Sequence, residues 1–338
     1  MANITFAEGS NLQNSIYGKS QDPILMMIED RAEAYEQRSV VKEIFFTEKS
    51  ENYGEKITSM TAMSGFMPVG ENGPHPVDGY QEGFSKFLEH VTWKDSFSIS
   101  REIIEDTRLM DLRQKPNKFI KGYYRTREQF GAALLGNAIQ GRSLMTFQKK
   151  KFSTTGADEE CLFVTNHPCK VKGGDQSNKF ADEFSADALD YAEERMQNYT
   201  GDDGELLDLN PDTILIPNLA PLKRKVFSVI GADKDPETAN NGFNFQFGRW
   251  RVVSWPYLNR FMADGTMPWM LMDSSYNEDY GTLVWLDRTE LELSSDEDKN
   301  TNAMIWRGYS RFIAGFNDWR GISCGGLTGG TQLVSSGA

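Results

Sequence analysis

Acidic side chains that stand close together in the sequence are the first candidates for chemistry in this chain. Glu102 lies near Glu105 and Asp106, and Asp202 is followed by Asp203. A glycoside hydrolase needs two carboxylates at a set separation, one of them with a raised pKa. With 49 acidic residues in the chain, however, such pairs also arise by chance. The acidic pairs alone therefore do not predict an active site.

Cys161, His167 and Cys169 are the second candidate, because thiolates and imidazoles are zinc ligands. Their spacing matches no zinc motif, and a fourth ligand is not evident. His167 has no paired nucleophile nearby, so we predict a structural role for it. The chain also lacks a nucleophile–base signature and a phosphate-binding glycine pattern. The sequence predicts no catalytic residue, no metal site and no cofactor.

The composition favours a protein that folds in a cytoplasm. Apolar residues make up 39% of the chain and aromatic residues 12%, which is enough for a core. No run of about 18 apolar residues could cross a membrane, and the N-terminus does not have the pattern of a signal peptide. The three cysteines are an odd number and are expected to be reduced thiols. The net charge of −13 argues against a nucleic-acid-binding surface.

The longest helical pattern runs from about Lys118 to Gln140. Its apolar residues recur at spacings of three, four and seven, which places them on one buried face. Pro116 suits the first turn of such a helix, and Gly141 suits its end. We expect the core of this helix to contain Phe119, Tyr123, Phe130 and Leu134.

A long two-stranded ribbon is predicted before this helix. Its strands start at Val41 and Phe87, and a Gly/Pro-rich stretch joins them. An isolated ribbon is marginally stable, and a ribbon with an apolar tip needs a partner surface to cover that tip. The ribbon therefore predicts association with another subunit through the tip residues Met60, Met63, Phe66, Met67 and Val69.

The first residues indicate an extended arm that ends in a short helix from Asp22 to Tyr35. The apolar face of this helix has two interpretations: it packs on its own domain, or it reaches over a neighbouring subunit. The residues concerned are Ile24, Met27 and Ile28.

The second half of the chain reads as a small α/β unit followed by two long strands. We predict helices that begin at Ser185 and Asn218, and long strands over 283–293 and 304–309. Shorter strands are predicted over 162–164, 213–216, 243–247, 249–255 and 268–273.

Two segments and the order of the elements resemble a known family. The segment Phe97–Asp106 reads F-x-I-S-R-E-x-I-E-D, and Leu162–Pro168 reads L-F-x-T-x-H-P. A ribbon, this first segment and then a long helix resemble the major capsid proteins of tailed bacteriophages, which have the Hong Kong 97-like fold. The similarity is greatest to the Mu-like major head subunits.

The resemblance implies an α+β fold in which an axial domain is inserted in a peripheral domain that contains the long spine helix. The expected parts are an N-terminal arm (1–40), an extended loop (41–97), the peripheral domain (98–180), the axial domain (181–283), return strands of the peripheral domain (284–318) and a C-terminal tail (319–338).

The implied function is assembly into pentamers and hexamers of an icosahedral shell that encloses double-stranded DNA without sequence-specific binding. A portal protein is a further expected partner. Because only about forty residues precede the ribbon, we expect scaffolding to be a separate protein or not to be needed. The protein would assemble in the host bacterial cytoplasm and reside in the virion. Two alternatives remain open: an encapsulin-like nanocompartment shell, and a soluble carbohydrate-active enzyme, against which the ribbon argues.

Overall fold

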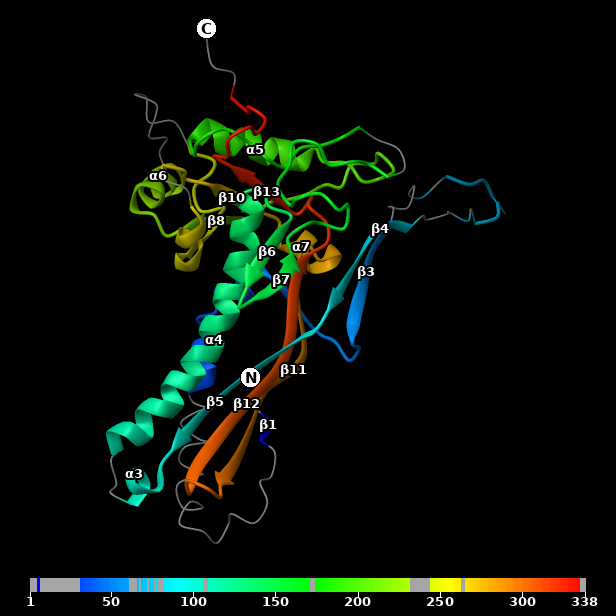
Figure 1. Cartoon of the computed structure of the whole chain (residues 1–338). Helices are drawn as coiled ribbons and strands as arrows, with labels where there is room; N and C mark the ends of the chain where they lie inside the picture. The colour runs from blue at the N-terminus through cyan, green and yellow to red at the C-terminus, as the bar shows by residue number, and fades with distance from the viewer. Residues whose placement is uncertain are drawn as a thin grey trace. The chain divides into compact units, whose positions relative to one another are not determined.

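The computed structural model describes residues 5–6, 31–60, 66, 68–71, 73–75, 77, 82–105, 109–170, 174–231, 244–262 and 265–334. They form an α+β protein with two compact units (Figure 1). The first unit takes its residues from Met1–Glu55, Leu88–Gly131 and Trp285–Ala314, and the second from Lys56–Phe87, Ala132–Val284 and Gly315–Ala338.

The first unit is built on a five-stranded sheet. Its strands follow the order β1 (Thr5–Phe6), β11 (Leu283–Asp298), β12 (Ala303–Phe316) and β5 (Val91–Ile99), and β2 (Phe46–Lys49) also pairs with β11. β5 and β12 are antiparallel, from Ile99 opposite Met304 to Val91 opposite Phe312. The helices are α2 (Val40–Ile44), α3 (Arg101–Glu105), the first part of α4 (Leu109–Ile139) and a short helical segment over 31–36.

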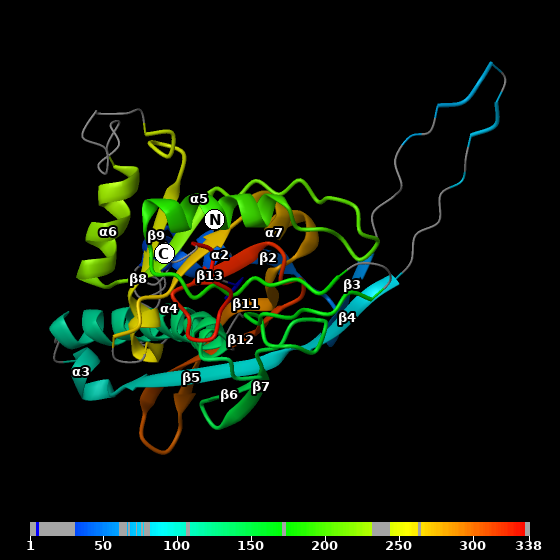
Figure 2. The same cartoon turned by 90° about the horizontal axis from the view of Figure 1, so that it is seen from above.

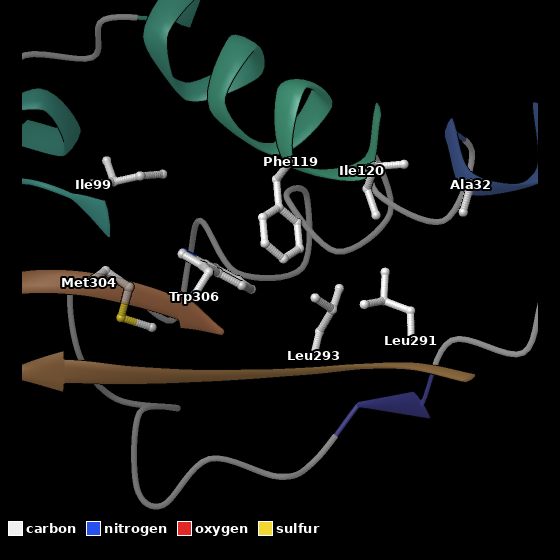
Figure 3. Packing of buried hydrophobic residues seen from close by; sticks show 8 residues of the cluster. All are labelled: Ala32, Ile99, Phe119, Ile120, Leu291, Leu293, Met304 and Trp306. Carbon is white, nitrogen blue, oxygen red and sulfur yellow. The ribbon is translucent and has the colours of Figure 1, made fainter. Parts of the chain in front are cut away.

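One face of α4 packs on this sheet through a buried apolar cluster. Figure 3 shows Phe119 and Ile120 of α4 above side chains of β11 and β12. Phe119 approaches the sheet so closely that a Cβ at Gly308 would overlap its ring. The strand contributes only backbone at this point, and the ring fills the space. The other members of the cluster are Ala32, Ile99, Leu291, Leu293, Met304 and Trp306.

A second group of aromatic residues in this unit surrounds a buried ion pair. The Arg127 guanidinium donates to both carboxylate oxygens of Asp287 at 2.7 and 2.8 Å. It also lies over the Trp285 ring, 4.6 Å from the ring centroid. Phe130 is fully buried and packs edge-on against Trp285. Tyr123 lies next to Arg127, whose Nη1 donates to the Tyr123 hydroxyl at 3.2 Å.

The second unit contains a four-stranded sheet in the order β13 (Ile322–Gly325), β10 (Trp269–Met272), β8 (Thr213–Pro217) and β9 (Arg251–Trp255). β8 is parallel to β9, and β10 is antiparallel to both β8 and β13. Every residue of β8 and β10 is buried, as expected for strands covered on both faces. The helices are α5 (Ala186–Gln197), α6 (Ala220–Ile230), η2 (Pro256–Phe261) and α7 (Ser274–Tyr280).

The remaining strands form two separate two-stranded sheets. β6 (Leu144–Phe147) and β7 (Lys150–Ser153) form a short antiparallel hairpin in the second unit. β3 (Gly54–Met60) and β4 (Glu82–Glu89) form a two-stranded ribbon, and Figure 2 shows them side by side. The second ribbon strand was predicted to start at Phe87, but β4 starts at Glu82, and the residues from Val91 onward form β5 of the five-stranded sheet.

Several sequence predictions are confirmed at the level of single elements. The hydroxyl of Ser185 accepts from the backbone N–H of Ala188 at 3.1 Å and caps α5. The predicted strand over 213–216 is the buried strand β8. The two predicted long strands are β11 and β12.

The start of the long helix was predicted too late. α4 begins at Leu109, and Pro116 lies inside it rather than in its first turn. Proline has no N–H, so the carbonyl of Leu112 lacks its intrahelical donor. With 31 residues α4 is about 46 Å long, at about 1.5 Å per residue.

Four other local predictions were wrong. The strand expected from Val41 is helix α2, because Val41 and Ile44 are also three residues apart and bury the same helical face. Residues 162–164 form no strand, and the side chain of Asn178 satisfies the Leu162 carbonyl. Residues 245–249 are turns, not a strand. The N-cap of α6 is Leu219, without a side-chain hydrogen bond, rather than Asn218.

Removing one partner of the buried ion pair should destabilise the first unit strongly. We expect R127M to lower the free energy of unfolding by about 3–5 kcal/mol, because Asp287 would remain buried and uncompensated. The double variant R127M/D287L should recover most of this loss. Urea denaturation of the free subunit measures both.

The exposed pair of Lys49 and Glu290, with a 2.8 Å N–O distance, is the matched control. K49M should cost less than about 1 kcal/mol, because solvent screens this pair. A cost of that size for R127M as well would contradict the importance given to the buried pair.

Candidate assembly surface at the ribbon

The residues that could have performed chemistry are engaged in structural contacts. Asp202 Oδ1 accepts from Arg320 Nη2 at 2.8 Å, and both side chains are buried. Asp203 Oδ1 instead accepts from the backbone N–H of Glu205. Glu102 lies in the short helix α3, and Asp106 is outside the described residues. Asp202 and Asp203 therefore do not form a pair of catalytic carboxylates.

Arg320 is the centre of a buried network in the second unit. Its Nε donates to the carbonyl of Thr200 at 3.0 Å, and its guanidinium stacks 4.9 Å from the centroid of the Trp319 ring. Asp318 accepts from Arg320 at 3.3 Å and from the Tyr276 hydroxyl at 2.7 Å. Every charge in this network has a partner, which is the condition under which buried charges are tolerated.

His167 is part of the same interior. Its ring stacks on Trp319 with 4.2 Å between centroids. Nδ1 lies 2.6 Å from Asp158 Oδ2, and Nε2 lies 3.1 Å from Asn178 Oδ1. These contacts occupy both ring nitrogens, so the predicted structural role of His167 agrees with its surroundings.

The two cysteines near His167 are free thiols and half-buried. The Cys169 thiol donates to the carbonyl of Asp202 at 3.2 Å. Within the described ranges, no group of three or more His, Cys, Asp or Glu side chains is arranged to hold a metal ion. None of the described helices is long and apolar enough to cross a membrane.

The ribbon presents exposed apolar side chains beyond its two strands. Phe66 and Val69, both predicted tip residues, are 109% and 53% exposed, and Val77 is 98% exposed. Met60 ends β3. The side chain of Met60, the tip residues Met63 and Met67, and the arm residues Ile24, Met27 and Ile28 lie outside the described residues.

The predicted residues of the long helix lie where a core requires them. Phe130 and Leu134 are fully buried, Phe119 is buried and Tyr123 is half-buried. Phe119, Tyr123 and Phe130 belong to the first unit, and Leu134 belongs to the second.

Two lysines hold the base of the ribbon in the second unit. Lys86 of β4 donates to the carbonyl of Thr155 and lies 3.4 Å from the hydroxyl of Ser153. Lys170 donates to the carbonyl of Gly83 and lies 5.5 Å from the centroid of the Phe84 ring. We call Lys86, Lys170 and the groups that they bind the ribbon clamp.

Burial changes the electrostatics of the ribbon clamp. It lowers the pKa of the Lys86 ammonium from its ordinary value of 10.5 to about 8, and Asp158 counteracts this only in part. Only glycine fits at position 83, because a Cβ there would overlap the Ser59 hydroxyl and lie 3.0 Å from Asp202 Oδ2. The ribbon base is thus packed and hydrogen-bonded, while its apolar tip is exposed.

The ribbon clamp has little signature in the sequence. Lys86 stands in an alternating strand pattern where a lysine ordinarily faces water, and Lys170 stands in a polar loop. The one available signal was Gly83, the second residue of β4, since a glycine within a strand indicates a close approach of another group.

Comparison with known proteins shows the family. A family model described as phage capsid protein matches residues 85–323, which is more than half of the chain. No curated protein sequence matches the chain.

Solved shell structures show only a distant likeness. The mature capsid of bacteriophage PhiM1 has 11% identity and a TM-score of 0.47, with 84% of each chain covered. Mycobacterium phage Patience has 9% identity and a TM-score of 0.49, with 99% of this chain and 96% of that chain covered.

The SrpI encapsulin complex of Synechococcus elongatus PCC 7942 has 8% identity and a TM-score of 0.49, with 89% of this chain and 90% of that chain covered. These likenesses do not separate phage capsids from encapsulins, so the assignment rests on the family model. The chain belongs to the phage capsid protein family, and its role in the virion is structural.

Proposed function

We propose that this chain is the major capsid protein of a tailed phage, and that its copies form the pentamers and hexamers of an icosahedral shell around double-stranded DNA. The observation that carries this proposal is the ribbon, with an apolar tip in solvent and a base held by the ribbon clamp. Membership of the phage capsid protein family supports it.

The tip explains why copies would associate. Phe66, Val69 and Val77 leave most of their apolar surface in water. Burying such a side chain contributes about 1.5–3 kcal/mol, so a surface that covers all three gains appreciably. In a shell of identical subunits the available surface is that of another copy. The ribbon of one copy would therefore lie on its neighbour.

The ribbon clamp supports this arrangement because it limits the directions that the ribbon can take. A docking element that is already ordered loses less conformational entropy on binding. Lys170 binds the backbone carbonyl of Gly83 in β4, and the side chain of Lys86 in β4 binds the carbonyl of Thr155, so the clamp holds both the backbone and a side chain of the strand.

The division of the chain into functional parts belongs to the same proposal. Residues 1–40 would be the arm, 41–97 the extended loop, 98–180 the peripheral domain, 181–283 the inserted axial domain, 284–318 the return strands and 319–338 the tail. A separate scaffolding protein and a portal protein would be partners, and the genome would be enclosed without sequence-specific contacts. The net charge of −13 supports the last point, since like charges repel.

Removing the ribbon tip should abolish closed shells without unfolding the subunit. In the test variant an Asn-Gly turn replaces residues 61–81 and joins β3 directly to β4. We expect this variant to fold but to give less than about a tenth of the wild-type yield of shells. Electron microscopy and sedimentation of particles from cells with the other head genes measure the yield.

A set of point variants tests the apolar contact itself. F66S/V69S/V77S should lose shells with an almost unchanged free energy of unfolding, because these side chains are exposed in the subunit. The matched variant F66L/V69I/V77I should retain shells. Wild-type yields from the Asn-Gly variant would refute the proposal, and shells that contain a protein cargo instead of DNA would favour an encapsulin.

The ribbon clamp should also produce a pH dependence of stability. The folded pKa of Lys86 is about 8 and its ordinary value is 10.5. Between these values the unfolded chain binds more protons, so stability rises with pH. Relative to K86M, the wild type should gain at most about 3 kcal/mol from pH 8 to pH 10.5. Parallel curves of unfolding free energy against pH for the two proteins would contradict this.

A further inference from the structure

The β6–β7 hairpin is a basic projection on an acidic protein. Lys149, Lys150 and Lys151 are consecutive and all exposed. Lys150 Nζ lies 6.0 Å from the centroid of the Phe152 ring. None of the three forms an ion pair with another residue in the described part of the chain. With a net charge of −13, such a concentration of unpaired positive charge requires an explanation.

The turn of this hairpin has a strained backbone at Gln148 and Lys149. Phe147 pairs with Lys150, so only Gln148 and Lys149 form the turn. Both have positive φ angles, 45° and 70°. Residues with a Cβ adopt this conformation at a cost, and glycine or asparagine is usual in such a turn. Strained backbone of this kind is concentrated at functional sites.

The β11–β12 hairpin ends in three consecutive acidic residues, followed in its turn by one exposed lysine, Lys299. Asp296, Glu297 and Asp298 are the last residues of β11. Asp298 is directed to its own turn, where it accepts from the Thr301 hydroxyl at 2.7 Å. Asp296 is 65% exposed, and its contact with Arg307 is long, at 3.4 Å. The carboxylate of Asp296 is therefore accessible to an outside cation, and the half-buried Glu297 beside it adds negative charge.

We propose that the basic β6–β7 hairpin of one copy binds the acidic end of the β11–β12 hairpin of a neighbouring copy. This inference rests on the proposed function and deepens it. Each copy carries both surfaces at different positions in the chain, which gives a head-to-tail contact that repeats from copy to copy. Complementary charge fixes the register of such a contact and speeds the encounter.

A second copy fits the basic hairpin better than DNA does. Leu144 of β6 is 57% exposed on the same hairpin, and Phe147 is half-buried. Apolar side chains beside the charges suit a protein surface, whereas a DNA backbone is bound by polar and cationic groups. The acidic net charge of the whole chain further disfavours DNA as the partner.

Charge reversal on both sides tests the contact in the full chain. K149E/K151E and D296K/E297K each place like charges against one another, and each should reduce the shell yield at least tenfold at about 0.1 M salt. The combined variant restores opposite charges and should recover at least half of the wild-type yield. All three retain Asp298, which caps its own turn.

The matched control is K118E/K121E, which makes the same change in net charge at two exposed lysines of α4. It should keep at least half of the wild-type yield. Circular dichroism and thermal unfolding must show each variant folded. If the folded single-sided variants assemble normally, or the combined variant does not recover, the pairing is wrong.

Particle contents separate this inference from the other possibilities. If K149E/K151E gives normal shells that retain less DNA, the hairpin contacts DNA and the proposed pairing is overturned. In that case the wild type still forms shells, so the proposed function stands. Failure of the proposed function has a different result, namely that the wild type forms no shells even with the other head genes.

Discussion

The buried ion pair between Arg127 and Asp287 fixes how α4 lies on the sheet of the first unit. It joins α4 to β11, and the aromatic rings of Trp285 and Phe312 cover it. A well-packed apolar pair could be equally stable, but it would not require one helix position to face one strand position. The bidentate geometry does require this, because two parallel N–H···O bonds form only in one register. The apolar cluster around Phe119 then follows, since it lies on the same helix and the same two strands.

The interior of each unit pairs its charged groups, whereas the ribbon leaves apolar groups uncovered. Buried charges in both units have partners: Arg127 with Asp287, and Arg320 with Asp202 and Asp318. The ribbon instead leaves apolar side chains in water, at Phe66 and Val77 almost completely. A monomeric protein gains nothing from such residues, and they favour aggregation. Under the proposed function the same property would provide free energy of assembly, and the clamp at Lys86 and Lys170 would limit which surface the tip can reach.

The sequence predicts helices and strands that have strong local signals. It does not predict elements whose structure depends on contacts between residues far apart in the chain. Ser185 and the apolar run over 213–216 identified α5 and β8, because a cap and a buried strand are local features. The interior position of Pro116 was not predictable, since tertiary packing of α4 offsets the lost hydrogen bond. The residues of α2 fit both an alternating strand pattern and a helix in which Val41 and Ile44 share one buried face. Only packing distinguishes the helix from the strand.

The residues of the candidate assembly surface also differ in whether the sequence could predict them. The apolar tip was predictable, because apolar side chains in a Gly/Pro-rich segment can be recognised from the sequence alone. The ribbon clamp was not, because Lys86 and Thr155 are 69 positions apart and the carbonyl that binds the lysine has no sequence signature.

Charge in this protein is sorted by position, and the sorting has a consequence for assembly. Opposite charges are paired in the interior, where an unpaired charge would be costly. At the surface, positive charge gathers on the β6–β7 hairpin and negative charge on the end of β11. Contacts between exposed charges are individually weak and screened by salt. A shell made of many identical subunits benefits from such weakness, because a subunit that binds in the wrong register can dissociate before its neighbours trap it. In the proposed assembly, the apolar ribbon tip would supply the stronger attraction, while the separated charges would select the correct neighbour.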